Sequence, residues 1–253
     1  MDASVSAADF GALLSAAFSE NGLSVPDPAA SERFYRLYLF LEEENQKMNL
    51  TAIRGAADTV VRHFADCAAA AKHIPPGAAA ADIGAGAGFP TLPLAILRQD
   101  LQILAVDSTA KRMDYVARAA AHLSLSNVKT HVGRAEEMGK DPAFRERFDV
   151  VTARAVARMN VLAEWCLPLC RVGGLFLSLK GKNGAEELAE ARHAVSLLGG
   201  GKTEDEAYFL RDPFRPEDDP DHLGARHILK VTKTGRTPAQ YPRKNGQITA
   251  KPL

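Results

Sequence analysis

The 253-residue sequence predicts an α/β protein with a doubly wound, seven-stranded sheet, an antiparallel hairpin at one sheet edge and a helical extension at the N-terminus. Two observations lead to this class. From residue 78 onward, short apolar runs alternate with helical stretches, which is typical of a parallel sheet with right-handed crossovers. After residue 198, two further apolar runs follow each other without a helix between them, which indicates an antiparallel pair.

The first part of the chain is predicted to be helical. Apolar side chains recur at helical spacing over 7–20, and Asn21-Gly22 follows as a stop signal. Asp27 is a suitable N-cap for a second helix, because proline at position 28 fits the first helical turn. A third helix is expected over 58–71.

Seven apolar runs are expected to form the sheet. The five parallel strands are predicted at 79–84, 101–108, 127–133, 148–155 and 173–181, and the hairpin strands at 206–212 and 227–234. Helices are predicted between them at 92–98, 111–123, 159–170 and 185–198. We therefore expect three parts: a helical extension (1–72), a ligand-binding sheet domain (73–234) and an extended tail (235–253).

The charges are unevenly distributed although the formal net charge is zero. Asp221 is the last acidic residue, and the stretch from Arg226 to Leu253 carries seven lysines and arginines. A basic end on a neutral protein favours a polyanionic partner, and a tail that only improves solubility is the alternative.

The composition argues against several other classes. No apolar run approaches the roughly 20 residues that a membrane span needs. The N-terminus has no basic residue before its weakly apolar stretch, so a secretory signal is not expected. The three cysteines lack metal-ligand spacing and are expected to be reduced. We expect a cytoplasmic, monomeric protein without a metal or a membrane partner.

The glycine-rich stretch "ADIGAGAGFPTLP" (81–93) indicates a ligand-binding loop between the first strand and its helix. Backbone N–H groups and the positive end of a helix dipole converge at such a loop. A nicotinamide or flavin dinucleotide, a nucleoside triphosphate and S-adenosylmethionine would all suit a loop of this general kind.

Three details favour S-adenosylmethionine. The third glycine of a dinucleotide pattern is absent, since Phe89 or Thr91 stands at that position in either register. A carboxylate at Asp82 would repel two phosphates and attract an ammonium group. Asp107 ends the second strand, where it can accept hydrogen bonds from both ribose hydroxyls. No Gly-Lys-Ser/Thr follows, which makes a triphosphate less suitable. The strand and hairpin order also resembles the Rossmann-like sheet of S-adenosylmethionine-dependent methyltransferases.

The end of the fourth strand indicates the methyl acceptor. "DPAF" (141–144) precedes this strand and is interpreted as a loop rather than an amine-methylation turn, and no cysteine lies near 152–158 to attack a pyrimidine. Arg154 follows the strand without a candidate general base. A nucleophile with a lone pair and no proton, such as guanine N7, needs no base. A structural ion pair is the alternative role for Arg154.

Several motifs in this order resemble the bacterial guanine-N7 methyltransferases of small-subunit ribosomal RNA, the glucose-inhibited division protein B family. They are "NLTAIR", "RHFADC", "DIGAGAGFPTLPLAI", "VDSTAKR", "RAEE", "VTARAVAR", "LKG" and "YPRKNG". The resemblance runs from about residue 45 to the tail, and it implies N7 methylation of one guanine in the decoding-region hairpin, on ribosomal RNA or the 30S subunit. A ribosome-assembly factor with a vestigial cofactor pocket and a small-molecule methyltransferase are the alternatives.

The residues expected at the site follow from the loop and from this resemblance. Cofactor contacts are expected at Asp82, Gly84, Gly86, Gly88, Phe89, Asp107, Ser108, Ala135, Glu136 and Arg154. Arg154 and Lys180 are the candidate catalytic residues, and Asn49, Arg243 and Lys244 are the candidate RNA contacts. His63 and Asp66 also match motif positions, and a hydrogen-bonded helix pair is the alternative for them.

Overall fold

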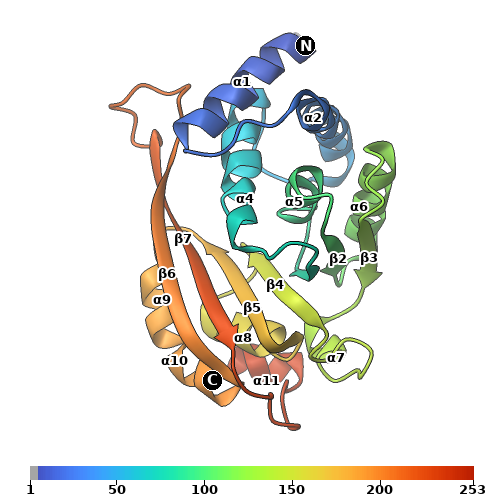
Figure 1. Cartoon of the computed structure of the whole chain (residues 1–253), viewed down its shortest axis with the longest axis vertical. Coiled ribbons are helices and arrows are strands. Elements are labelled where there is room, and N and C mark those ends of the chain that lie inside the picture. The colour runs from blue at the N-terminus through green and yellow to red at the C-terminus, as the bar shows by residue number, and fades with distance from the viewer. Residues whose placement is uncertain (1–4) are drawn as a thin grey trace.

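The computed structural model describes residues 5–253 and contains a seven-stranded sheet in the order β3-β2-β1-β4-β5-β7-β6 (Figure 1). Its strands are β1 (Ala79–Ile83), β2 (Gln102–Asp107), β3 (Val128–Val132), β4 (Phe148–Arg154), β5 (Cys170–Lys180), β6 (Gly200–Arg211) and β7 (Leu223–Lys233). The first five strands pair in parallel, and β7 pairs antiparallel with both β5 and β6. The predicted fold class, with its antiparallel edge hairpin, is therefore confirmed.

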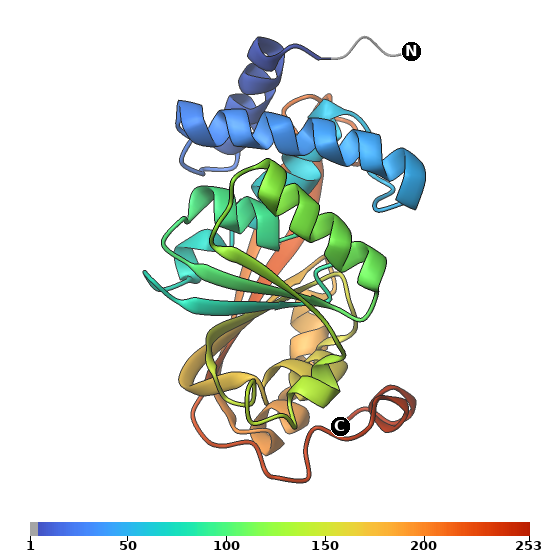
Figure 2. The same cartoon turned by 90° about the vertical axis from the view of Figure 1, so that its right-hand side faces the viewer.

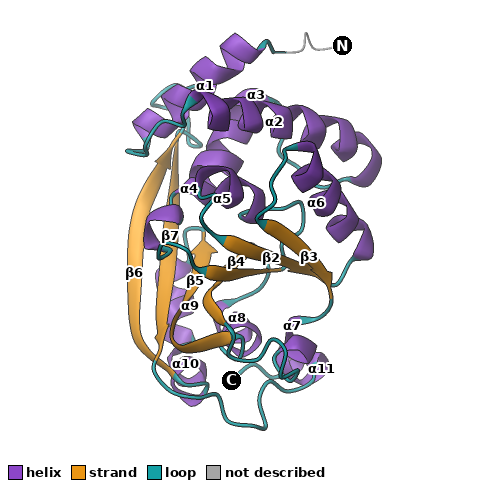
Figure 3. Ribbon diagram, turned by 45° about the vertical axis from the view of Figure 1, so that its right-hand side comes forward, coloured by secondary structure: helices purple, strands orange, loops and turns teal. Residues whose placement is uncertain are grey.

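Helices cover both faces of this sheet (Figures 2 and 3). The N-terminal helical part comprises α1 (Ala7–Glu20), α2 (Pro28–Met48), α3 (Ala56–Thr59), the π-helix η1 (Val60–Ala65), α4 (Asp66–Ala68) and the 3₁₀-helix η2 (Ala71–His73). The others are α5 (Thr91–Leu97), α6 (Ala110–His122), α7 (Ala135–Met138), α8 (Met159–Cys166), α9 (Gly184–Glu190), α10 (Arg192–Leu197) and α11 (Asn245–Ala250). No helix within residues 5–253 is long and apolar enough to span a membrane.

The two sheet faces bury two separate apolar clusters. Side chains alternate between the faces along each strand, so Val150 points into one cluster and Val151 into the other. The first cluster joins the sheet to α1, α2, α5 and α6, and includes Phe10 and Phe34. The helices before residue 72 thus share a core with the sheet, and the predicted boundaries at 72 and 234 remain predictions.

Several predicted elements differ from the structure. The helix expected over 159–170 ends at Cys166, because Pro168 has no backbone N–H to continue the helical hydrogen bonds, and β5 already begins at Cys170. The helix expected over 185–198 is divided into α9 and α10. The tail, predicted to be extended, contains α11, whose Ile248 is fully buried. Burial of one apolar side chain per turn lets so short a helix form.

Candidate functional site

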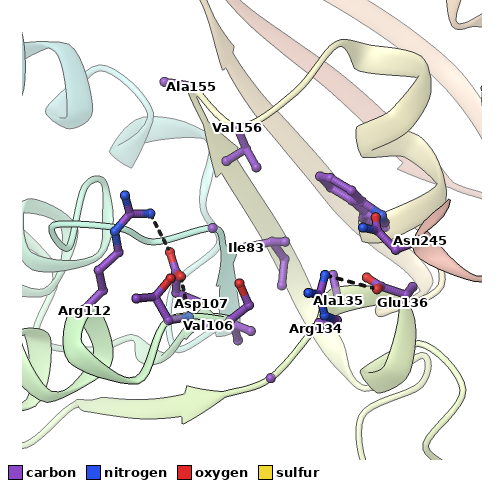
Figure 4. A pocket seen from close by; sticks show the side chains of 15 residues that line it. Ile83, Val106, Asp107, Arg112, Arg134, Ala135, Glu136, Ala155, Val156 and Asn245 are labelled. Carbon is purple, nitrogen blue, oxygen red and sulfur yellow. Dashed lines mark hydrogen bonds and ion pairs between the residues drawn. The ribbon is translucent and has the colours of Figure 1, made fainter. Parts of the chain in front are cut away.

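A cavity of about 300 Å³ opens at the carboxyl ends of β1 to β4 (Figure 4). Ligands of open α/β sheets bind at this edge, because the strand order reverses direction there between β1 and β4. The cavity is lined by Ile83, Gly84, Val106, Asp107, Ser108, Thr109, Arg112, Gly133, Arg134, Ala135, Glu136, Ala155, Val156, Trp165 and Asn245.

The glycine loop is a tight turn that leaves β1. Gly84 and Gly88 have φ angles of +73° and +82°, which residues with a Cβ atom rarely adopt. A Cβ atom at Gly84 would lie 2.5 Å from a methyl group of Val156, so this turn packs directly on the loop that follows β4. Glycine at this position therefore lets the two loops meet beside the cavity.

Asp107 is held rigidly at the end of β2. One carboxylate oxygen accepts a 2.8 Å hydrogen bond from the backbone N–H of Thr109, and the other accepts a 3.2 Å bond from the N–H of Gly86. Arg112 approaches the second oxygen at 3.5 Å. The oxygen bound to Thr109 has a further lone pair, and the contact of Arg112 with the other oxygen is long, so Asp107 can still accept hydrogen bonds from a ligand diol.

Polar groups also gather where α7 begins. The backbone N–H of Ala135 belongs to the first turn of a helix and has no partner within it. Arg134 and Glu136 form an ion pair of 3.9 Å beside it. Asn245 lies at this end of the cavity (Figure 4), and Trp165 also lines the cavity. Of the predicted cofactor residues, those lining the cavity are Gly84, Asp107, Ser108, Ala135 and Glu136.

Asp82 does not line the cavity, and its predicted contact with the cofactor remains a prediction. The carboxylate is buried and accepts hydrogen bonds from the hydroxyls of Thr91, at 2.6 Å, and Thr152, at 2.9 Å. Burial raises the pKa of Asp82 to about 6, against the opposing effect of these hydrogen bonds. These hydrogen bonds connect β1 to β4 and to the start of α5, and they thereby order the glycine loop between β1 and α5.

Gly86, Gly88 and Phe89 shape the loop but do not line the cavity. The N–H of Gly86 holds the carboxylate of Asp107. The ring of Phe89 is buried and stacks on His63, with the ring centroids 4.1 Å apart. Their predicted contacts with a cofactor remain predictions.

Arg154 points away from the cavity and into the N-terminal helical part. Its guanidinium donates to Asp66, with Nε at 3.0 Å, and to the backbone carbonyl of Arg62, at 2.7 Å. Asp66 also accepts from Arg226, at 3.2 Å, and Tyr208, at 3.3 Å. Arg154 thus forms the structural ion pair that was the alternative role, with a carboxylate on α4, and its predicted contact with the cofactor remains a prediction.

His63 is a neutral, buried histidine beside this ion pair. Its Nε2 lies 2.9 Å from the hydroxyl of Thr51, and its Nδ1 lies 3.3 Å from Arg154. Burial, together with the positive charge of Arg154, lowers the pKa of His63 from 6.5 to about 3. The π-helical segment η1 carries His63, and π-helical turns are frequent at functional sites.

The depressed pKa of His63 predicts an acid-sensitive contribution to stability. The unfolded chain binds a proton on this histidine below pH 6.5 and the folded chain does not, so stability present above pH 6.5 is lost as the pH falls toward 3. We expect the stability advantage of the wild type over His63→Gln to shrink by roughly 2 kcal/mol between pH 7.5 and pH 5. Urea denaturation of both proteins at pH 7.5 and at pH 5 measures this difference in the free energy of unfolding. His193→Gln, at an exposed position, is the control, and a constant difference for His63→Gln would contradict the prediction.

Lys180 is engaged at the end of β5. Its ammonium group lies 2.6 Å from a carboxylate oxygen of Glu187 and donates to the carbonyl of Ala157 at 2.5 Å. The same glutamate accepts from the backbone N–H of Met159. Lys180 thus supports the loop that carries Val156, and its catalytic role remains a prediction.

The predicted RNA contacts lie in three different environments. Asn49 is exposed at the C-cap of α2, where its φ angle of +50° ends the helix. Lys244 is exposed. Arg243 instead binds the buried carboxylate of Glu164, with an Nη2–Oε2 distance of 2.6 Å, so its guanidinium is not free for a phosphate.

The basic C-terminal stretch is largely neutralised within the fold. Ion pairs engage Arg226, Lys230, Lys233, Arg236 and Arg243. Within residues 5–253, Lys244 and Lys251 are the members of this stretch that form no ion pair. Fewer positive charges are therefore available to a polyanionic partner than the sequence suggests, because acidic residues from distant parts of the chain pair with them.

Five of the fifteen cavity residues were predicted from the sequence, and the ten that were missed include Arg112, Val156, Trp165 and Asn245. Arg112 and Val156 follow predicted strands closely, so their positions after β2 and β4 could have indicated them. Trp165 lies in a helix and Asn245 in the tail, where no local pattern marks a ligand site. The folding of the tail against α8 brings Asn245 to the cavity that Trp165 lines.

The cavity fits a nucleoside-containing cofactor. Its volume lies at the lower end of the range of about 300–1,000 Å³ for small-molecule sites. Asp107 suits the two hydroxyls of a ribose, and the turn at Gly84 allows close approach of a ligand to the backbone. The polar groups at the start of α7 suit the edge of a base.

Solved structures share this fold. An O-methyltransferase from Bacillus cereus in complex with SAH is 15% identical, with a TM-score of 0.55 over 88% of this chain and 100% of that chain. A SAM-dependent O-methyltransferase from Thermotoga maritima is 16% identical, with a TM-score of 0.52 over 78% of this chain and 72% of that chain. These likenesses show that the chain has the fold of S-adenosylmethionine-dependent methyltransferases.

The sequence comparison identifies the family. Residues 30–207 match the family model GidB, described as rRNA small subunit methyltransferase G, and the chain belongs to this family. A relative named ribosomal RNA small subunit methyltransferase G, from an Exiguobacterium species, is 44% identical over 87% of this chain and 90% of its own length. A relative of the same name from Geobacillus thermodenitrificans is 42% identical over 94% of this chain and 97% of its own length.

Proposed function

We propose that this protein transfers the methyl group of S-adenosylmethionine to N7 of a guanine in the decoding-region hairpin of small-subunit ribosomal RNA. The observation that carries the proposal is the family match over residues 30–207, since this range contains every cavity residue except Asn245. The family gives the substrate class, which is small-subunit ribosomal RNA. The methylated base, guanine, and the methylated atom, N7, are inferred from the sequence.

The chain's own residues bind and orient in this reaction. S-adenosylmethionine supplies, when bound, a methyl group on a positively charged sulfur. Asp107 would hold the ribose, and Ala135 and Glu136 would contact the base. The turn at Gly84 and the loop at Val156 also line the cavity, after the carboxyl ends of β1 and β4. Fixing the reactants in line lowers the barrier without a change of protonation.

Two buried groups next to the glycine loop support transfer without a general base. His63 is neutral and both of its ring nitrogens face hydrogen-bonding groups. Asp82 accepts hydrogen bonds from two threonine hydroxyls. Guanine N7 carries a lone pair and no proton, so methyl transfer does not require His63 or Asp82 to accept a proton.

The partner and location belong to the same proposal. The acceptor is free ribosomal RNA or RNA within the 30S subunit, and the enzyme acts as a monomer in the cytoplasm without a metal ion. Exposed Lys244 and Lys251 are the tail residues available for phosphate contacts. Bases of single-stranded loops can be splayed out and recognised at their Hoogsteen edge, which contains N7.

A methyl-transfer assay tests the proposal. Purified protein is incubated with S-adenosylmethionine labelled in the methyl group and with either small-subunit RNA, 30S subunits or a metabolite extract. We expect label in the RNA of one of the first two substrates. Label in a metabolite alone would identify a small-molecule methyltransferase, and cofactor binding without any transfer would favour an assembly role.

A further inference from the structure

The C-terminal segment, residues 241–250, forms part of the cavity wall. Asn245 of this segment lines the cavity beside Glu136 (Figure 4), and Trp165 of α8 lines the same cavity. This is the end of the cavity at which α7 begins, and Asp107 and Arg112 lie across the cavity from it (Figure 4). A segment predicted to contact RNA thus reaches the cofactor site.

Two polar atoms at this wall lack partners. The indole Nε1 of Trp165 and the side-chain Oδ1 of Asn245 are inaccessible to solvent and form no hydrogen bond within the described chain. The first is a donor and the second is an acceptor. Buried polar groups are normally paired, so an unpaired donor and acceptor in one cavity wall indicate a ligand that supplies both complements.

A buried ion pair sets these two side chains beside each other. The carboxylate of Glu164 is fully buried and accepts from the backbone N–H of Arg243, at 2.7 Å, and from its guanidinium, at 2.6 Å and 2.9 Å. Trp165 directly follows Glu164, and Asn245 stands two residues after Arg243. The pair therefore fixes the position of the segment at the cavity rather than providing a phosphate contact.

A second arginine, Arg145, holds the start of this C-terminal segment in place. Arg145 donates to the carbonyls of Tyr241, at 2.8 Å, Thr237, at 2.7 Å, and Gly139, at 2.6 Å. Gly139 follows α7, so the same guanidinium ties the tail to the helix that borders the cavity. Together with buried Ile248, these contacts make the wall a fixed part of the fold.

We infer that Asn245 and Trp165 recognise the adenine base of the cofactor. The 6-amino group of adenine is a donor that matches Asn245 Oδ1, and its ring nitrogens are acceptors that match Trp165 Nε1. A base with an oxo group at position 6 would present an acceptor to the asparagine oxygen and be rejected. This inference rests on the proposed function for the identity of the cofactor.

Titration calorimetry with two ligands tests this inference. S-adenosylhomocysteine and S-inosylhomocysteine differ at position 6 of the base, where the first has an amine and the second an oxo group. We expect the wild type to prefer the adenosyl ligand at least tenfold. We expect Asn245→Ala to bind the adenosyl ligand about tenfold more weakly and to lose most of this preference. Trp165→Phe, which keeps an aromatic side chain and removes the donor, should weaken the binding of both ligands severalfold.

Gln247→Ala is the matched control, because Gln247 is exposed on the same short helix. Circular dichroism checks that each variant is folded. Unchanged affinity and unchanged preference in folded Asn245→Ala would overturn the inference while leaving the proposed function intact. Failure of the wild type to bind either ligand would overturn both.

Discussion

Arg154→Ala is expected to destabilise the protein by about 3 kcal/mol. The substitution leaves Asp66 buried with Arg226 and Tyr208 as its remaining side-chain partners. Removing one member of a buried ion pair lowers the free energy of unfolding by about 3–5 kcal/mol. Because Asp66 keeps two partners, we expect a value at the lower end of this range. For a chain of this size, the midpoint of thermal unfolding should fall by roughly 10 °C.

Arg171→Ala is the matched control for this experiment. Arg171 pairs with Asp149 at 2.5 Å, but half of its side chain is exposed, so its loss should cost less than about 1 kcal/mol. A midpoint for Arg154→Ala within 2 °C of the wild type would contradict the structural role. Methyl transfer at a temperature at which Arg154→Ala is folded decides whether the arginine also has a catalytic role.

Asp107→Ala is expected to weaken the binding of S-adenosylhomocysteine at least 100-fold. The carboxylate orders the loop by accepting from the N–H groups of Gly86 and Thr109, and it is the candidate acceptor for the ribose hydroxyls. Hydrogen bonds to a charged group contribute about 1.5–3 kcal/mol each, so the loss of two accounts for this change. Calorimetric titration measures the dissociation constant.

Asp114→Ala controls for the loss of one negative charge. Asp114 is on the exposed face of α6, where its side chain is 68% accessible and pairs with Arg118. Its removal should leave the affinity unchanged. An affinity of Asp107→Ala within threefold of the wild type would show that the ribose lies elsewhere.

The sheet could be predicted because its signals are local. Each parallel strand is a short apolar run, and each strand is followed by a helix with an apolar face, so alternation alone gives the class. The ends of α8 and β5 could not be placed, since Pro168 breaks a helical pattern that continues on either side of it. The bounds of β6 were also missed, because the glycines at 199–201 do not resemble a strand.

The site could be predicted only where it depends on strand order. Gly84, Asp107 and Ala135 follow three neighbouring strands, and parallel topology brings strand ends together. The direction of Arg154 depends on Asp66, 88 residues earlier, and no local pattern encodes such a pairing. Asn245 reaches the cavity for the same reason, through an ion pair that joins residues 79 apart.

Chemical mapping of the methylated base tests the central claim most directly. Small-subunit RNA from a strain lacking this protein is treated with purified enzyme and S-adenosylmethionine, then reduced with borohydride, cleaved with aniline and reverse transcribed. Methylation at N7 predicts one new stop in the decoding-region hairpin, present with the wild-type protein and absent with Asp107→Ala. Methyl incorporation into the RNA without any new cleavage would place the methyl group on another atom and contradict the claim.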